Sequence, residues 1–399
     1  MKFDYFFRNP DTQVMVDGPL KGLNIAIQPN IQIKGWPSDA GSRALSGYTA
    51  LEDSTVIKRL KDAGAYIGGS TRMSEFGFGL NKSHAGEAVK QGAADAELIL
   101  DMMGEARLAA TERGVPGYKP GYGLISRYGL IGLIPSMESC GVISKNIQGI
   151  RAILGVIAGQ DGLDFSMPDE DIPDLRKKEI HPAKTTIGII TEALNMLPEK
   201  ERELFSGSIN SLKNEGFIIR EFSLLDFHLF SLVHSIAGSV EASSCAGRYD
   251  SVRYGERAPG AKNWNEMYIQ SRGAAFGELL KCFLIQGAYF QFEQYRAFED
   301  ACRIRARLLK GMDQIYSQAD FLLFPAINST GADDTGGLSS IYREFTFTLF
   351  ANVTGQPVLC LPSDSDSGQT GFQLAGPRNS DGGLLTLGEY ILSRRDGGK

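Results

Sequence analysis

A short segment in the first third of the chain holds the side chains that are best placed to do chemistry. Residues 97–107, with the sequence ELILDMMGEAR, predict an apolar run, a break at Gly104 and a helix that begins at Glu105. A carboxylate at a helix N-terminus could act as a nucleophile or a general base. The helix dipole also favours a carboxylate there without any catalytic role. Since nothing nearby in the sequence is positioned to activate Glu105, we prefer this second interpretation.

Metal and dithiol chemistry are not indicated by the sequence. None of the four histidines has the spacing of a metal ligand within a helix. The five cysteines stand singly, without a CxxC pair, and this predicts inert thiols in a reducing compartment. We therefore expect neither a metal site nor a cofactor.

The elements around this segment alternate between strands and helices. Apolar runs predict strands at 23–28, 65–69, 185–191, 319–326, 357–362 and 371–377. Amphipathic or capped stretches predict helices at 54–64, 86–97, 198–215, from about 146, and over most of 261–318. This alternation predicts an α/β fold with a mixed or largely parallel sheet. The acidic stretch 159–182 predicts a surface connection, and residues 393–399 predict a frayed tail.

Composition and charge limit the classes of partner. The chain of 399 residues has a net charge of −6, which argues against a broad nucleic-acid-binding surface, so direct nucleic-acid binding is not expected. The first 13 residues lack the uninterrupted apolar core of a signal peptide. No stretch approaches the roughly 20 apolar residues of a membrane helix. We expect a soluble, cytoplasmic protein with no membrane association.

Several stretches follow one another in the order and character of a known family. They are 18–35, 54–79, 117–146, 241–258 with 267–281, and 351–362. Together they resemble the amidase-signature family over nearly the whole chain. Arg127, Tyr128, Gly129 and the segment 249–255 resemble, within that family, the A subunits of glutamyl-tRNA(Gln) amidotransferases. The resemblance implies one α/β domain over 1–399, with a mixed central sheet flanked by helices.

The resemblance also implies a catalytic apparatus of three side chains and a glycine-rich turn. In the family, a lysine takes a proton from a serine in a cis peptide, and that serine relays it from a nucleophilic serine at a helix start. Backbone N–H groups of the turn receive the oxyanion. The matching positions here carry Gln28, Asn81 and Glu105. An amide does not titrate in the useful range and cannot relay a proton as a hydroxyl does, so we interpret all three positions as degenerate.

The turn before Glu105 also departs from the family pattern. Where the family has Asp-Thr-Gly-Gly-Ser, residues 101–105 are DMMGE. Methionine restricts the backbone and fills space, so Met102 and Met103 are expected to occupy the former cavity. Asp101 and Arg107 are expected to form, with Glu105, a charged cluster, which we interpret as a salt bridge closing a disused cleft.

The substrate pocket implied by the resemblance is altered at each position. The related A subunits hold the amino-acid end of glutamine with a tyrosine, an arginine and an aspartate. The matching positions here are His234, Cys282 or Phe283, and Phe345. Loss of the arginine matters most, because a buried substrate carboxylate needs a bidentate cation.

Two adjacent residues offer the types of a substitute hydrolytic pair. Ser83 and His84 lie near the position of the bridging serine. Adjacent side chains rarely point at each other, so we do not expect a repaired dyad. They remain candidates for the wall of a remodelled cleft.

These observations favour a catalytically inactive, amidase-like protein that serves as a structural or regulatory component of a complex. Its expected partner is an amidase-like or amidotransferase B-subunit-like protein, or a second copy of the chain. Two alternatives stay open. A rewired amide hydrolase or glutamine-dependent amidotransferase-like enzyme would use Glu105, Asp101, Asn81 and His84 on a different substrate. A sensor would bind a small molecule in the remodelled cleft.

Overall fold

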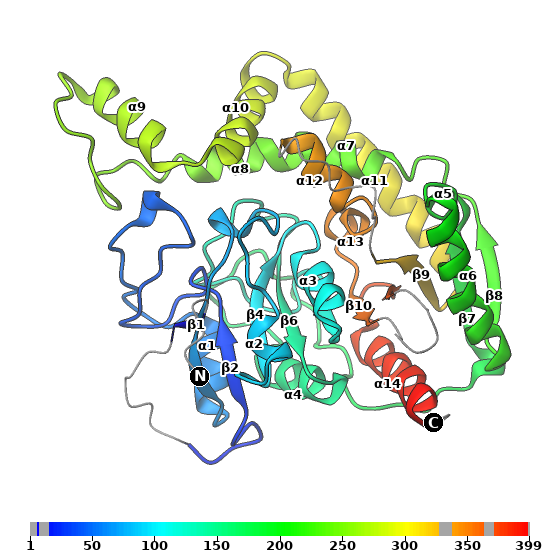
Figure 1. Cartoon of the computed structure of the whole chain (residues 1–399). Helices are drawn as coiled ribbons and strands as arrows, with labels where there is room; N and C mark the ends of the chain where they lie inside the picture. The colour runs from blue at the N-terminus through cyan, green and yellow to red at the C-terminus, as the bar shows by residue number, and fades with distance from the viewer. Residues whose placement is uncertain (1–5, 8–15, 327–336, 363–370, 398–399) are drawn as a thin grey trace.

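The strands of the protein join in one mixed sheet, with helices packed around it (Figure 1). The computed structural model describes residues 6–7, 16–326, 337–362 and 371–397. Within those ranges eleven strands pair in the order β1-β3-β2-β4-β6-β5-β10-β11-β9-β7-β8. Their bounds are β1 Phe6–Phe7, β2 Asn24–Ile27, β3 Tyr66–Thr71, β4 Ala96–Asp101, β5 Gly117–Lys119, β6 Ser139–Ser144, β7 Thr186–Ile190, β8 Ile218–Phe222, β9 Phe321–Pro325, β10 Val358–Leu361 and β11 Phe372–Ala375.

The α-helices follow most of the predicted segments. They are α1 Thr55–Asp62, α2 Glu87–Lys90, α3 Glu105–Arg113, α4 Ile147–Ile157, α5 Thr191–Asn195, α6 Glu199–Asn214, α7 Leu229–Val233, α8 Ser239–Ala246, α9 Trp264–Ala275, α10 Glu278–Phe292, α11 Tyr295–Tyr316, α12 Leu338–Glu344, α13 Leu349–Thr354 and α14 Asp381–Gly397. A π-helical turn, His234–Gly238, joins α7 to α8. None of these helices is long and apolar enough to cross a bilayer.

Side-chain caps explain why two of the helices begin where they do. The Ser54 hydroxyl accepts the N–H of Ile57 ahead of α1, and the Asn146 side chain accepts the N–H of Gly149 ahead of α4. Each bond satisfies one of the backbone donors that the first helical turn leaves free. The predicted helices at 54–64 and from 146 are therefore confirmed.

Two sequence predictions are wrong. The expected helix over 86–97 is only the four residues of α2, because Gly92 takes a positive φ of 73° and the chain then enters β4. The tail expected to fray from residue 393 is instead helical in α14 as far as Gly397, and residues 398–399 lie outside the described ranges. Arg395 holds this end in place by donating to the carbonyl of Pro362, at 3.0 Å. The stretch 160–181 contains neither helix nor strand, as a surface connection requires.

The parallel arrangement of three strands defines the edge at which the site is built. β2 pairs with β3 on one side and with β4 on the other, and both pairs are parallel. The carboxyl ends of the three strands therefore meet at one edge of the sheet. Gln28, Arg72 and Met102 each follow one of these ends. α3 packs on one sheet face through alanines that contact Ile99 and Ile143.

Candidate functional site

The turn between β4 and α3 is built by a glycine that no other residue could replace without strain. Gly104 has a φ of 132°, in the region that favours glycine. A Cβ atom at this position would lie 2.3 Å from the Cβ of Thr348. The Thr348 hydroxyl also donates to the carbonyl of Met103. The turn is thus held tightly against the chain just before α13.

The carboxylate of Glu105 fills the ring of N–H groups that this turn presents. Its Oε2 accepts the N–H groups of Met102 and Met103 at 2.8 Å each, and that of Gly104 at 3.1 Å. Its Oε1 accepts the N–H of Gly79 at 3.1 Å. Successive backbone N–H groups that converge in this way form an anion-binding nest. The protein supplies the anion from its own side chain, and Glu105 is only 2% exposed.

The surroundings of Glu105 change its ionisation. Burial, together with the negative charge of Asp101, raises the pKa of Glu105 to about 7, although the N–H groups of the nest oppose this rise. A carboxyl group with a pKa near neutrality could serve as a general acid or base in an open site. Here the group is enclosed and its oxygens are engaged by backbone donors.

Arg107 is the centre of a buried polar network behind the nest. It forms a bidentate ion pair with Asp101, through Nε–Oδ2 at 3.2 Å and Nη2–Oδ1 at 2.9 Å. Its remaining N–H groups donate to the carbonyl of Thr348 and to the side-chain oxygens of Asn352 and Gln373. All five guanidinium donors therefore have acceptors. Arg107 is 0% exposed and lowers the pKa of Asp101. Its bonds to Thr348, Asn352 and Gln373 tie α3 to the C-terminal part of the chain.

Asp101, Glu105 and Arg107, expected to form one charged cluster, have different hydrogen-bond partners. Arg107 engages Asp101, whereas the carboxylate of Glu105 turns the other way, into the nest and toward Gly79. The Asn352 amide closes the network by donating to Asp101 Oδ1 at 3.0 Å. The ion pair is thus structural in its contacts, and Glu105 is linked to it through the negative charge of Asp101, which, together with burial, raises the pKa of Glu105.

The two methionines and His234 close the site. Met102 and Met103 are both 0% exposed. His234 lies in the π-helical turn, and its Nε2 donates to the carbonyl of Met102 at 3.0 Å while its Nδ1 accepts from the Tyr342 hydroxyl at 3.0 Å. Burial lowers the pKa of His234 to about 4, so the imidazole is neutral. Its single N–H forms the hydrogen bond to the carbonyl of Met102 that stabilises the turn.

The positions matched to a substrate pocket are also packed with apolar side chains. Phe283 and Phe345 are both 0% exposed, and Phe283 stacks on Phe78 with ring centroids 4.4 Å apart. Cys282 is exposed to solvent instead. Of the two residues proposed for the lost arginine, Phe283 is therefore the one that faces inward.

The other candidate residues do not join Glu105. Gln28 is buried at the end of β2, and its N–H donates to the carbonyl of Leu98. Asn81 is exposed and lines a shallow surface depression with Glu75. The Ser83 hydroxyl accepts the N–H of Ala85 in a local turn. His84 is half-buried next to it.

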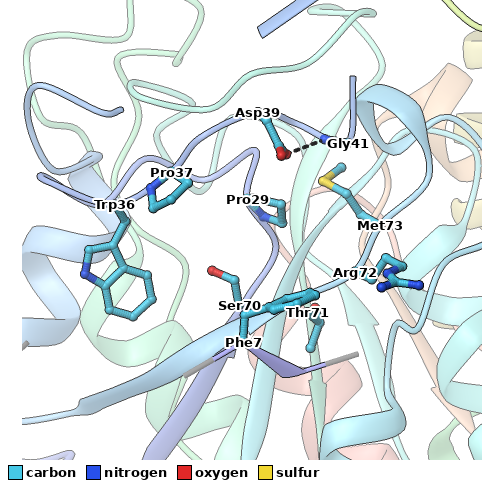
Figure 2. Close-up of a pocket in the computed structure, with 10 residues that line it drawn as sticks. All are labelled: Phe7, Pro29, Trp36, Pro37, Asp39, Gly41, Ser70, Thr71, Arg72 and Met73. Carbon is cyan, nitrogen blue, oxygen red and sulfur yellow. Dashed lines mark hydrogen bonds between the residues drawn. The ribbon is translucent and has the colours of Figure 1, made fainter. Parts of the chain in front are cut away.

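An open cavity lies beside this closed site, at the carboxyl ends of β2 and β3. It has a volume of about 550 Å³ and is lined by Phe7, Pro29, Trp36, Pro37, Asp39, Gly41, Ser70, Thr71, Arg72 and Met73 (Figure 2). In Figure 2 the rings of Trp36 and Phe7 border the cavity and the Asp39 carboxylate caps it, bonded to the N–H of Gly41 at 2.8 Å. Its size and mainly apolar lining are those of a small-molecule site.

The sequence indicated the carboxylate at the helix start and Arg107 but missed the groups to which both side chains bond. Thr348, Asn352 and Gln373 come from segments more than 240 residues away along the chain. Gly79, which binds Glu105, gave no signal beyond its place in a glycine-containing loop. Long-range contacts of this kind have no local sequence pattern.

The fold and this strand–turn–helix site define the class of protein. A family model described as Amidase matches residues 9–93 and 101–385, so the chain belongs to the amidase family. The chain is 30% identical to the A subunit of the glutamyl-tRNA(Gln) amidotransferase of Natronomonas pharaonis, over 98% of this chain and 100% of that protein. It is 32% identical to the corresponding protein of Haloarcula marismortui, over 94% and 96% of the two chains.

The comparison of folds agrees with this assignment. The solved structure of the corresponding A subunit of the Thermotoga maritima glutamyl-tRNA(Gln) amidotransferase matches with a TM-score of 0.79. The match covers 96% of this chain and 85% of that one, at 23% sequence identity. The family and the α/β fold with a mixed sheet, expected from the sequence, are confirmed.

Proposed function

We propose that this chain is a non-hydrolysing member of the amidase family that works as a structural or regulatory component of a complex. One observation carries the proposal: the Glu105 carboxylate occupies the N–H nest of residues 102–104. By the resemblance, this is the place where an active relative would receive the oxyanion of its substrate. A resident carboxylate there blocks the site sterically and repels a second negative charge.

The chemistry around the nest supports the same conclusion. To attack an amide as a nucleophile, Glu105 would have to give up its four backbone hydrogen bonds. His234 is the nearby residue type best suited to act as a base, but the lone pair of its Nδ1 accepts the Tyr342 hydroxyl, while its Nε2–H donates to the carbonyl of Met102. Among the described residues, buried methionine and phenylalanine side chains fill the space around the nest. The rewired-enzyme alternative is therefore disfavoured.

The names of the relatives support a role within a complex. The proteins of Natronomonas pharaonis and Haloarcula marismortui are both named as subunits of an amidotransferase. A protein that retains the fold but has a closed site could bind a partner without catalysing a reaction. The partner expected on these grounds is an amidase-like or amidotransferase B-subunit-like protein.

Affinity capture tests this role. The tagged full-length chain would be isolated from its own cells and the complex weighed by native mass spectrometry. We expect a second, different polypeptide in fixed stoichiometry, retained equally by the Glu105→Gln variant because that change lies inside the protein. Recovery of the chain with no other polypeptide would contradict the role.

The cavity beside Trp36 favours a second candidate function, that of a small-molecule sensor. Because the site around Glu105 is closed, we assign the ligand to this cavity instead. The chain has two tryptophans, and the other one, Trp264, is 59% exposed on α9. In a Trp264→Phe variant, the fluorescence of Trp36 reports binding in the cavity directly. A metabolite that shifts this fluorescence and raises Tm supports the sensor, and the Asp39→Ala variant should weaken both effects.

A further inference from the structure

The carboxylate of Asp39 borders the open cavity without a cationic partner. Its Oδ1 atom accepts the N–H of Gly41 at 2.8 Å, and Figure 2 shows the carboxylate at the rim of the cavity. Across the ranges that the structure describes, no lysine, arginine or histidine side chain forms an ion pair with it. A half-buried carboxylate has a strong preference for a positive charge once a ligand displaces the water around it. Asp39 therefore gives the cavity a point of attachment for a cation.

The turn that carries Asp39 is strained and tightly held. The next two residues, Ala40 and Gly41, have φ angles of 49° and 68°, in the left-handed region. That region is unfavourable for alanine, because its Cβ atom approaches the carbonyl oxygen. The carbonyl of Ala40 accepts the N–H of Phe76 at 2.7 Å, and a Cβ added to Gly41 would lie 2.9 Å from the carbonyl oxygen of Ser74. Packing thus maintains the kind of backbone conformation that is common at ligand sites, and it fixes Asp39 at the cavity.

Aromatic and polar side chains complete the wall of the cavity. The rings of Trp36 and Phe7 border it, and the Ser70 side chain points its hydroxyl into it (Figure 2). The face of an aromatic ring attracts a cation and also packs against apolar groups. The Ser70 hydroxyl makes no hydrogen bond to another described residue, so it is available to a ligand.

The guanidinium of Arg72 places a positive charge at one end of the cavity. Its central carbon lies 5.9 Å from the centroid of the Phe7 ring. Figure 2 shows Phe7 and Asp39 on opposite sides of the cavity. A ligand whose single positive charge lies near Asp39 keeps that charge away from Arg72, whereas a second positive charge would be repelled. The charges of the wall therefore favour a ligand with one positive charge rather than two.

We propose that the cavity binds a monoamine, in which one protonated primary amine is carried on an apolar or aromatic body. The ammonium group pairs with Asp39, and the body packs against Trp36 and Phe7. This inference rests on the second candidate function, in which the cavity binds a small molecule, and it names the class of that molecule. The volume of about 550 Å³ accommodates such a compound. A neutral ligand would bury Asp39 without a counter-charge, and Asp39 would repel an anion.

Calorimetric titration of the full-length chain at neutral pH with three compounds tests this class. Phenethylamine, 2-phenylethanol and 3-phenylpropionate have the same ring and similar chains, but they carry an ammonium, a hydroxyl and a carboxylate. We expect the amine to bind about tenfold more tightly than the alcohol and the acid to bind most weakly, because a hydrogen bond between two charged groups is the strongest kind. The fluorescence of Trp36 in the Trp264→Phe variant should change when the amine is added, which locates the binding in the cavity.

The Asp39→Asn variant separates the effect of charge from that of shape. The amide oxygen of asparagine can still accept the N–H of Gly41, so the turn is kept while the charge is removed. We expect this variant to lose the advantage of the amine, which is about tenfold, and to bind the alcohol as before. Asp62→Asn, a matched change at an exposed aspartate at the end of α1, should bind all three compounds as the wild type does. The Tm of each variant shows whether the fold is intact, and the three titrations test the preference in the wild type without any variant.

Several results would overturn the inference. An alcohol that binds as tightly as the amine, or an amine that Asp39→Asn binds as tightly as the wild type does, would exclude the amine class and leave the cavity as a small-molecule site. Binding of the amine without a change in the fluorescence of Trp36 would place it elsewhere on the protein. If none of the three compounds binds, the inference fails, whereas a metabolite that shifts the fluorescence of Trp36 would still support the sensor. No measurement involves an amide substrate, so the inference stands apart from the proposed lack of catalysis.

Discussion

The carboxylate of Glu105 accepts the N–H of Met103, two residues before it, at 2.8 Å. The side chain thus folds back over the turn that starts its own helix. The nest and the helix N-terminus favour negative charge on this carboxylate, while burial and Asp101 oppose it. Because the protein's own side chain occupies the nest, the site is closed to an outside anion.

The ionisation of Glu105 should appear in the pH dependence of stability. Its pKa is raised from 4.5 to about 7 in the folded protein, so the folded state binds more protons than the unfolded state between these values. Stability contributed by this group is present below pH 4.5 and is lost as pH rises through 7. Glu105→Gln keeps the shape and removes the charge. We expect the variant to match the wild type at about pH 5 and to be more stable by about 3 kcal/mol at about pH 8.

Urea unfolding at the two pH values provides the measurement. His234, with a pKa lowered from 6.5 to about 4, contributes in the opposite direction, because stability from this group rises with pH between these values. Both proteins contain His234, so its effect cancels in the difference. Glu97 provides a positive control, because burial also raises its pKa to about 7. The stability difference between Glu97→Gln and the wild type should therefore change with pH in the same direction. A difference for Glu105→Gln that does not change with pH would show that this carboxyl titrates normally.

The buried ion pair behind the nest should be costly to break from one side. Arg107→Met leaves Asp101 buried without its cation and frees acceptors on Thr348 and Gln373. We expect a loss of about 3–5 kcal/mol in the free energy of unfolding. Arg303→Gln, which removes an exposed ion pair with Asp300, should change it little. A loss below about 1 kcal/mol for Arg107→Met would mean that water or another side chain replaces the guanidinium.

The tight turn gives a paired glycine test. Gly104→Ala should destabilise by about 2–4 kcal/mol, because it combines an unfavourable φ with a clash against Thr348. Gly155→Ala, inside α4 with open space at the added Cβ, should stabilise by about 0.5–1 kcal/mol. Thermal unfolding of both variants measures the contrast. Equal effects at the two sites would contradict the geometry assigned to the turn.

Local patterns were enough to predict most of the fold. The apolar runs that became β2, β7 and β9 had to be buried, and the cap residues ahead of α1 and α4 marked their starts. The alanine-rich segment 86–97 has helical propensity but is mostly not helical. Gly92 breaks it, and the side chain of Asp95 accepts the N–H of Asn24 at the edge of β2. Tertiary contacts override propensity in such a short segment.

The site was predictable only in part, for a geometric reason. The spacing of Asp101 and Glu105 across a strand–helix break is local, so the carboxylate at the helix start could be identified. The position matched to the family's bridging serine is Asn81, yet the residue that meets Glu105 is Gly79. The loop between β3 and α2 has no long regular element that would fix its register, so counting along it does not locate a contact.

The proposed lack of amide-hydrolysing chemistry is tested most directly by ammonia release. The purified protein would be incubated at high concentration with glutamine, asparagine and simple amides, beside the Glu105→Ala variant and a buffer control. We expect that both proteins release no more ammonia than buffer. Ammonia that increases with the concentration of wild-type protein, and that disappears in Glu105→Ala, would contradict the proposal and establish Glu105 as a catalytic residue.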